Sequence, residues 1–235
     1  MPPKGRRDIP LRILDLCTGT GCIPLLLHSL LAPRYSELAI VGVDISDAAV
    51  QLANENTKRN VRLALLSRRA LREIGFQKRN VLEYGSREDS TAEDVPNSTS
   101  DDSGFIGSRW DVLISNPPYV SLSEYCDGTT SRSVRTFEPR LALVPPDTRH
   151  SPTVNNKHVQ HEDTFYYHIA FLVLNMRVKL AVLECGSRSQ ALRVASLCRD
   201  ILRLHAQVEQ MQVRVDIWSA SEFSAGPSAV LIYVE

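Results

Sequence analysis

The sequence predicts an α/β fold built on a mostly parallel sheet. Short apolar runs typical of buried strands alternate along the chain with stretches typical of helices. Near the C-terminus, residues 212–219 and 229–235 alternate apolar and polar side chains around a turn at residues 225–227, which read Ala-Gly-Pro. These observations indicate parallel strands joined by helices, followed by a C-terminal antiparallel strand pair.

Each element has a local signal in the sequence. Apolar runs predict strands at residues 11–16, 38–43, 76–82, 110–115 and 178–184. Helical patterns cover residues 23–31, 47–59, 63–74, 165–176 and 190–204. Pro33 ends the first helix, and Asp47 has a side chain suited to cap the second. Ligands of such folds bind at the carboxyl ends of the strands, so functional residues are expected there.

Length and composition favour one enzyme-sized domain over residues 1–235. The 235 residues are 43% hydrophobic, enough for a core, and 27 basic side chains balance 27 acidic ones. A neutral chain lacks the basic footprint of a protein that binds long duplex nucleic acid. The five cysteines form no C-x-x-C pair, and the six histidines form no H-E-x-x-H motif, so we expect free thiols and no metal site. No apolar run is long enough to predict a membrane span.

Two polar stretches are expected to be flexible insertions in this domain. Residues 86–108 are rich in Ser and Thr, and the part from Ser86 to Ser103 holds six acids and one base. Residues 145–163 are the second such stretch.

A glycine loop follows the first strand. Residues 15–21 read Asp-Leu-Cys-Thr-Gly-Thr-Gly, and the two glycines allow a tight turn with a ligand close to the next helix's N-terminus. The loop is neither a dinucleotide fingerprint nor a Walker motif. Asp44 ends the second strand, where a carboxylate can accept both hydroxyls of a ribose. We interpret the loop and Asp44 as a nucleoside site, with Asp15 anchoring the loop; a plain turn with Asp44 as a helix cap stays open.

The fourth strand runs into Asn116-Pro117-Pro118-Tyr119. The prolines stiffen the segment and have no backbone N–H, so their carbonyls, with the Asn116 side-chain carbonyl, can accept hydrogens from one planar NH2 group. Tyr119 can lie on the face of that group. The arrangement suits methylation of an amide or exocyclic amine, because it aims a weak nucleophile and stabilises its developing charge. The alternative is a proline-rich turn with Asn116 as a local bridge.

With these motifs the chain resembles the PrmC/HemK family of protein-(glutamine-N5) methyltransferases, which modify the glutamine of the Gly-Gly-Gln loop in peptide chain release factors. The matching segments are residues 13–23, 43–46, 114–120, 137–143 and 183–186, with Gln190. The Asn-Pro-Pro-Tyr tetrad also occurs in enzymes that methylate amino groups of DNA and RNA. The Glu138–Leu143 segment, Glu-Pro-Arg-Leu-Ala-Leu, is more particular to the glutamine enzymes.

The resemblance implies a class I S-adenosylmethionine-dependent methyltransferase fold, which is Rossmann-like with a seven-stranded, mostly parallel sheet and a C-terminal antiparallel pair. It implies S-adenosyl-L-methionine as cofactor and a release factor as protein substrate. Carried over by position, the cofactor residues are Asp15, Thr18, Gly19, Thr20, Gly21, Asp44, Asn80, Val81 and Asn116. Asn80 and Val81 take the adenine. The catalytic residues are Asn116, Pro117, Pro118 and Tyr119.

The chain departs from the family pattern in three ways. Cys17 stands where the family usually has glycine, and we expect a negative backbone φ there. The two polar insertions suggest a eukaryotic, fungal version. The family's N-terminal helical domain is expected to be absent, which puts the grip on the release factor in doubt.

Other functions remain open. An amino-methyltransferase acting on adenine or cytosine shares the tetrad, but it predicts a basic groove and stacking aromatics. A truncated, non-catalytic methyltransferase-fold module would keep the fold and lose the cofactor. For the leading hypothesis we expect a mitochondrial location, or otherwise a cytoplasmic one, no membrane partner, and no sequence-specific nucleic-acid binding.

Overall fold

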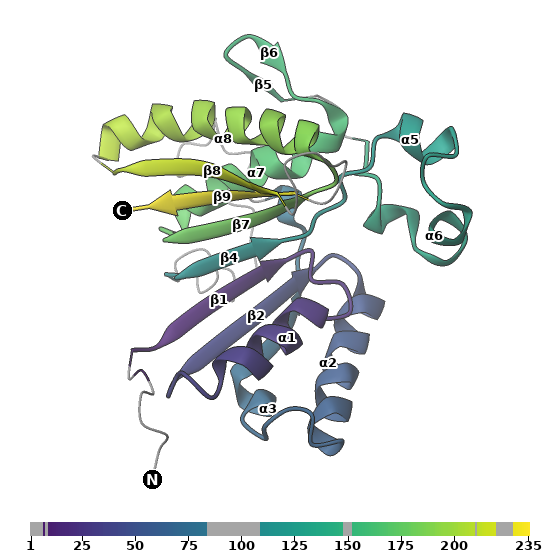
Figure 1. The fold of residues 1–235 in the computed structure, drawn as a ribbon, viewed down its shortest axis with the longest axis vertical. Helices are drawn as coiled ribbons and strands as arrows, with labels where there is room; N and C mark the ends of the chain where they lie inside the picture. Colours follow the sequence, from purple (N-terminus) through teal and green to yellow (C-terminus); the bar gives the residue numbers. More distant parts are fainter. Residues whose placement is uncertain (1–6, 8, 84–108, 148–151, 210, 220–227) are drawn as a thin grey trace, which may run out of the picture. The chain divides into compact units, whose positions relative to one another are not determined.

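The computed structural model describes residue 7 and residues 9–83, 109–147, 152–209, 211–219 and 228–235. The side chains of residues 204–209 are left aside. The chain divides into two compact units. Unit 1 comprises Met1–Asn80 and Asp111–Asn116, and unit 2 comprises Val81–Trp110 and Pro117–Glu235. Each unit is described by itself (Figure 1).

Unit 1 contains a four-stranded parallel sheet in the order β3-β2-β1-β4. Its strands are β1 (Leu11–Leu16), β2 (Leu38–Asp44), β3 (Ile74–Lys78) and β4 (Val112–Ser115). The register places Leu16 opposite both Val43 and Ser115. The predicted strands are confirmed, although β3 begins two residues earlier than the pattern suggested and ends at Lys78.

The helices of unit 1 are α1 (Cys22–Leu31), α2 (Asp47–Arg62) and α3 (Ala70–Glu73). Ser46, and not the expected Asp47, caps α2, because its side chain accepts a hydrogen bond from the Ala49 N–H. The predicted helix over residues 63–74 is wrong, since only α3 is helical there. Ala64 adopts a left-handed conformation with φ of 56°, which breaks the helical path after α2.

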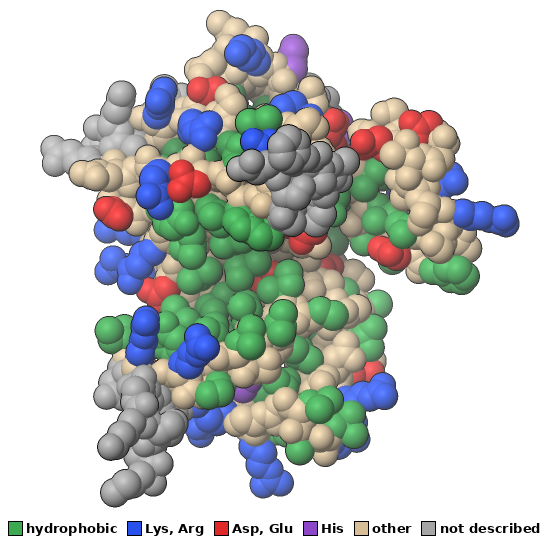
Figure 2. All heavy atoms as spheres, in the orientation of Figure 1, with side chains coloured by type: hydrophobic (Ala, Val, Ile, Leu, Met, Phe, Trp, Pro, Cys, Tyr) green, Lys and Arg blue, Asp and Glu red, His purple; other side chains and the backbone are tan. Residues whose placement is uncertain are grey.

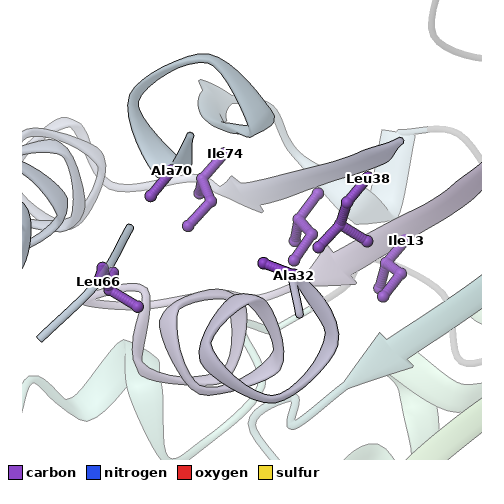
Figure 3. Close-up of a cluster of buried hydrophobic side chains, with 7 residues drawn as sticks. Ile13, Ala32, Leu38, Leu66, Ala70 and Ile74 are labelled. Carbon is purple, nitrogen blue, oxygen red and sulfur yellow. The ribbon is translucent and has the colours of Figure 1, made fainter. Parts of the chain in front are cut away.

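The core of unit 1 is an aliphatic cluster between the sheet and its helices. Figure 3 shows side chains from the strands, from the residue that follows α1, from the turn before α3 and from α3 pointing toward one another. The cluster consists of Ile13, Ala32, Leu38, Ile40, Leu66, Ala70 and Ile74. Burial of each Leu or Ile side chain contributes about 1.5–3 kcal/mol. This core therefore fixes the strands whose carboxyl ends carry the predicted cofactor residues.

Unit 2 contains three antiparallel strands in the order β7-β9-β8. They are β7 (Leu180–Cys185), β8 (Val213–Ser219) and β9 (Ser228–Val234). The long helices α7 (Thr164–Asn175) and α8 (Arg188–Glu209) pack against each other, and α8 also packs along β8 (Figure 1). The predicted antiparallel strand pair is confirmed. Its predicted turn at residues 225–227 lies outside the described residues.

Short elements fill the segment between Tyr119 and α7. They are α5 (Leu122–Cys126), α6 (Arg132–Phe137), the 3-10 turns η2 (Arg140–Ala142) and η3 (His161–Asp163), and the hairpin strands β5 (Thr153–Val154) and β6 (Lys157–His158). Ser121 and Glu124 form a capping box at α5, which explains a helix that the apolar pattern did not predict. Phe137 is 85% exposed, and Figure 2 shows hydrophobic side chains beside acidic and basic ones on the α5–α6 segment.

The two predicted insertions have different outcomes. Residues 86–108 lie outside the described residues. In the second insertion, residues 145–163, the described part includes the β5–β6 hairpin and η3, and Asp163 at its end is buried.

Together the two units supply seven sheet strands besides the hairpin, four parallel and three antiparallel. This content confirms the predicted Rossmann-like α/β class with a C-terminal antiparallel pair. Within the described ranges, no helix combines the length and the apolar character that crossing a membrane requires.

Candidate active site

The carboxyl edge of the unit 1 sheet gathers most of the predicted cofactor residues. Cys17 and Asn116 directly follow Leu16 and Ser115, which are paired in the ladder. The Ser115 hydroxyl, which is buried, donates to the Leu16 carbonyl at 2.9 Å. The glycine loop and Asn116 therefore leave the sheet at neighbouring positions, as the parallel topology predicts.

Asp15 anchors the glycine loop from inside the sheet. The Thr18 hydroxyl donates to Asp15 Oδ2 at 2.5 Å, and the Thr18 N–H donates to the Val43 carbonyl at 2.9 Å. The pKa of Asp15 is raised to about 7, because burial, with a smaller contribution from the nearby charge of Asp44, outweighs the Thr18 hydrogen bond, which lowers it. Oδ1 of Asp15 is buried and has no hydrogen-bond partner among the described residues.

Asp44 joins the loop to the start of α2. Its Oδ2 accepts the Gly19 N–H at 2.8 Å, and its Oδ1 accepts the Ser46 N–H at 2.9 Å. Each carboxylate oxygen can accept more than one hydrogen bond, so the group can also receive ribose hydroxyls. A Cβ built on Gly19 would meet no atom within 4 Å, so there is open space beside the loop at this position. These features fit a nucleoside ligand.

Packing beneath the loop depends on residues that the sequence did not single out. A Cβ at Gly21, whose φ is 81°, would lie 2.8 Å from the Phe76 ring, so only glycine fits above this ring. The Asn56 side chain of α2 donates to the Thr20 carbonyl at 3.0 Å. An aromatic residue in β3 and an asparagine on a helix carry no distinctive sequence signal.

The expected negative φ at Cys17 is wrong. Cys17 has φ of 59°, in the left-handed region that costs a non-glycine residue about 1–2 kcal/mol. The chain must turn sharply at this point, because the next N–H, that of Thr18, bonds the Val43 carbonyl of the neighbouring strand. Cysteine thus adopts the backbone conformation for which glycine is better suited. Burial raises the pKa of its thiol well above the ordinary range.

The two residues predicted to hold an adenine belong to different units. Asn80 follows β3 by two residues in unit 1 and is half-buried. Val81 opens the 3-10 turn η1 (Val81–Glu83) of unit 2, and its side chain is 4% exposed. The η1 turn packs against α7, which leaves little of Val81 for a ligand. The adenine assignment remains a prediction.

The four residues of the Asn-Pro-Pro-Tyr tetrad differ in their exposure to solvent. Asn116 is exposed, Pro117 and Pro118 are buried, and Tyr119 is half-buried. Among the described residues, neither the Asn116 side chain nor the two proline carbonyls form a hydrogen bond. The exposed Asn116 side chain therefore offers an acceptor to a donor such as an amide NH2 group, and the carbonyls of the next two residues, which are buried, have no other partner there.

Tyr119 is fixed by the loop after β7. A Cβ at Gly186 would lie 2.8 Å and 2.9 Å from two Tyr119 ring carbons, so the ring packs directly on the Gly186 backbone. Burial raises the pKa of Tyr119, and the charge of Glu184 adds to the shift. The phenol therefore stays protonated at neutral pH. The Val120 N–H donates to the carbonyl of Leu143, the last residue of the Glu-Pro-Arg-Leu-Ala-Leu segment.

Three polar residues of unit 2 join this arrangement. Gln190 bonds Tyr119, Gly186 and Asp163, and Arg193 pairs with Asp163 at 2.9 Å. Sequence reasoning noted Gln190 only as part of the resemblance and missed Asp163 and Arg193. A cavity of about 340 Å³ beside Tyr119 is lined in part by Gln190 and Arg193.

Among the described residues, the cysteines form no disulfide, and the cysteine, histidine and acidic side chains form no metal-binding cluster. All five cysteines lie within it and are free thiols. No cluster of three or more His, Cys, Asp and Glu residues is placed there to hold a metal ion.

Comparison with known proteins gives sequence relatives. The chain is 32% identical over 211 residues to the probable MRF1 mitochondrial N(5)-glutamine methyltransferase mtq1 of Schizosaccharomyces pombe, covering 86% of this chain and 56% of that protein. It is 30% identical over 139 residues to the mitochondrial MRF1 N(5)-glutamine methyltransferase MTQ1 of Saccharomyces cerevisiae, covering 59% and 35%. A release factor glutamine methyltransferase of Nitratidesulfovibrio vulgaris is 34% identical over 142 residues, covering 60% and 37%.

The chain thus spans about half the length, or less, of these relatives. No family model matches it. Among solved structures, it resembles the hMettl16 catalytic domain in complex with MAT2A 3'UTR hairpin 1, with a TM-score of 0.51 and 16% identity over 95% of this chain and 63% of that one. This likeness supports the fold alone. By sequence, the chain is similar over 86% of its own length to a protein named as a probable mitochondrial N(5)-glutamine methyltransferase, and over about 60% to the other two relatives.

Proposed function

We propose that this chain is the catalytic domain of an S-adenosylmethionine-dependent methyltransferase acting on the glutamine side-chain amide in the Gly-Gly-Gln loop of a peptide chain release factor. One observation carries the proposal. Asn116, exposed and with no side-chain hydrogen bond among the described residues, leaves the unit 1 sheet beside a glycine loop whose Gly19 N–H donates to Asp44. The sequence relatives, which are named for this activity, support it.

The cofactor residues of unit 1 would hold S-adenosylmethionine through the loop and Asp44. The Thr18, Gly19 and Gly21 N–H groups donate to Val43, Asp44 and Thr18, which fixes the loop, and Asp44 would accept the ribose hydroxyls. When bound, the cofactor supplies an electrophilic methyl group on a sulfonium sulfur. Asn80 and Val81 remain our candidates for the adenine.

Asn116 and the proline carbonyls would orient the substrate amide. Its NH2 group donates to these oxygens, which aim the nitrogen at the methyl carbon and stabilise the positive charge that develops on it. The nitrogen would take the methyl group that the cofactor supplies, as the carbon–sulfur bond breaks, and would then release one proton to water. No side chain needs to act as a strong base, since methylation makes that proton more acidic.

Tyr119 would cover the flat face of the amide. Its raised pKa keeps the phenol neutral, which avoids placing a phenolate beside an electron-rich group.

We also propose a mitochondrial release factor as partner and a mitochondrial location, on the strength of the names of the two fungal relatives. Neutral net charge supports a protein substrate over long nucleic acid.

The test is methyl transfer to a Gly-Gly-Gln peptide and to an intact release factor, followed by mass spectrometry, with a DNA and an RNA oligonucleotide as competing substrates. Asn116→Ala should abolish transfer, because its side-chain carbonyl would hold the substrate amide directly. Cofactor affinity, measured by calorimetry, should stay within about two-fold, because Asn116 is one of nine residues carried over for the cofactor. Asn175→Ala, at an exposed position at the end of α7, is the matched control and should be active.

Three results would contradict the proposal. Methylation of an oligonucleotide but not of glutamine would favour an amino-methyltransferase of nucleic acid. A folded wild-type chain without cofactor binding would favour a non-catalytic module. Equal loss of cofactor affinity in Asn116→Ala would contradict the role assigned to Asn116.

A further inference from the structure

We infer that Gln190 is a positioning residue that fixes the backbone of Tyr119 and, through it, the segment that orients the substrate amide. The inference rests on the proposed function. Gln190 lies in the first turn of α8, far along the chain from the tetrad, and its side chain is 4% exposed.

The carboxamide of Gln190 joins three segments of unit 2. Its Nε2 donates to the Tyr119 carbonyl at 3.2 Å and to Asp163 Oδ1 at 3.0 Å. Its Oε1 accepts the Gly186 N–H at 2.9 Å. A carboxamide can donate from its nitrogen to the Tyr119 carbonyl and to Asp163, and accept the Gly186 N–H at its oxygen. Neither a carboxylate nor an apolar side chain of that length can bond all three partners.

Asp163 and Arg193 hold this carboxamide in one orientation. Arg193 donates from Nε to Asp163 Oδ2 at 2.9 Å and from Nη2 to Oδ1 at 3.2 Å, a two-point contact that fixes the carboxylate. Asp163 is 3% exposed, so the bond that it receives from Gln190 is charge-assisted and shielded from water. The Gln190 amide therefore cannot flip without losing this bond.

Gln190 bonds both residues of the contact between the Tyr119 ring and Gly186. Gln190 bonds the Gly186 N–H on one side and the Tyr119 carbonyl on the other, while the ring packs against Gly186. Tyr119 follows the two proline carbonyls directly, so a shift of its backbone moves those acceptors. Misplacement of a reacting group by about 1 Å can lower turnover about 100-fold.

The decisive variant is Gln190→Glu, which keeps the side-chain size but turns a donor into an acceptor facing Asp163 and the Tyr119 carbonyl. We expect kcat on a Gly-Gly-Gln peptide to fall about 100-fold while the cofactor Kd stays within about two-fold. Gln51→Glu, at an exposed position of α2, makes the same chemical change as a control and should keep wild-type turnover.

A second variant separates positioning from simple stability. Gln190→Glu with Asp163→Asn restores a donor–acceptor pair between positions 190 and 163 but still leaves an oxygen facing the Tyr119 carbonyl. We expect the melting temperature to recover toward wild type while turnover stays low. Recovery of turnover together with stability would overturn the inference, because Gln190 would then serve the fold alone.

A readout without turnover completes the test. In protein labelled with fluorotyrosine, Tyr119→Phe identifies the Tyr119 signal in the fluorine NMR spectrum. We expect that signal to shift in Gln190→Glu and not in Gln51→Glu. An unmoved signal would overturn the inference. An inactive wild type would instead count against the proposed function, and the NMR comparison would still decide the role of Gln190.

Discussion

Replacing Asp44 with alanine should weaken the cofactor site and loosen the glycine loop together. The variant removes the acceptor of two N–H groups, those of Gly19 at 2.8 Å and Ser46 at 2.9 Å. Hydrogen bonds to a charged group contribute about 1.5–3 kcal/mol each, and water can replace part of them at this half-buried position. We therefore expect the free energy of unfolding to fall by about 2–3 kcal/mol, which lowers Tm by about 4–12 °C.

The cofactor Kd should rise at least about ten-fold, equivalent to about 1.4 kcal/mol. Titration calorimetry with S-adenosylmethionine and thermal unfolding measure the two effects on the same samples. Asp47→Ala is the control, three residues further along. Its exposed ion pair with Lys78 contributes at most about 1 kcal/mol, and its Kd should match wild type.

Wild-type cofactor affinity in Asp44→Ala would refute the assigned role. Equal losses in Asp44→Ala and Asp47→Ala would show that the start of α2, and not the carboxylate of Asp44, controls binding.

Two further predictions concern Asp15 and Gly186. The pKa of Asp15 is raised from 3.8 to about 7 in the folded chain, so the unfolded chain loses this proton at lower pH. The free energy of unfolding should therefore fall as pH rises from about 4 to 7, by up to about 4 kcal/mol. Asp15→Asn should remove that fall in urea denaturation curves compared at pH 4 and pH 8; parallel pH dependence of variant and wild type would contradict it. Gly186→Ala places a Cβ 2.8 Å from the Tyr119 ring, so kcat for methyl transfer should fall about 100-fold with little change in cofactor Kd. Wild-type kcat in this variant would show that the ring position is unimportant.

Much of the unit 1 edge could be predicted from local sequence. The Leu11–Leu16 and Leu38–Asp44 strands are short apolar runs with clear ends, and the parallel topology requires their carboxyl ends to share an edge. The glycine loop, Asp44 and Asn116 were therefore expected to lie together. The helix expected after α2 was too long, because an apolar period at residues 63–74 does not reveal a left-handed residue at Ala64.

The roles of the loop residues needed the tertiary structure. The sequence indicated a ribose carboxylate at Asp44, and the structure adds two backbone bonds that make it a loop anchor as well. The sequence analysis also predicted a negative φ at Cys17. In the structure this φ is positive, and the next N–H, that of Thr18, donates to the Val43 carbonyl of β2.

The sequence by itself therefore determined the order of the main sheet strands and of most long helices, and the places of the glycine loop and the Asn-Pro-Pro-Tyr tetrad, because these depend on periodicity and on contiguous residues. Only the tertiary structure decided which distant side chains support them. Gln190, Asp163 and Arg193 lie on different elements of unit 2, and a hydrogen-bond network between elements leaves no periodic trace in the chain. The contact between Phe76 and Gly21 is a second case. The Gly21 backbone approaches the Phe76 ring too closely for a Cβ, and no local sequence pattern predicts such an approach.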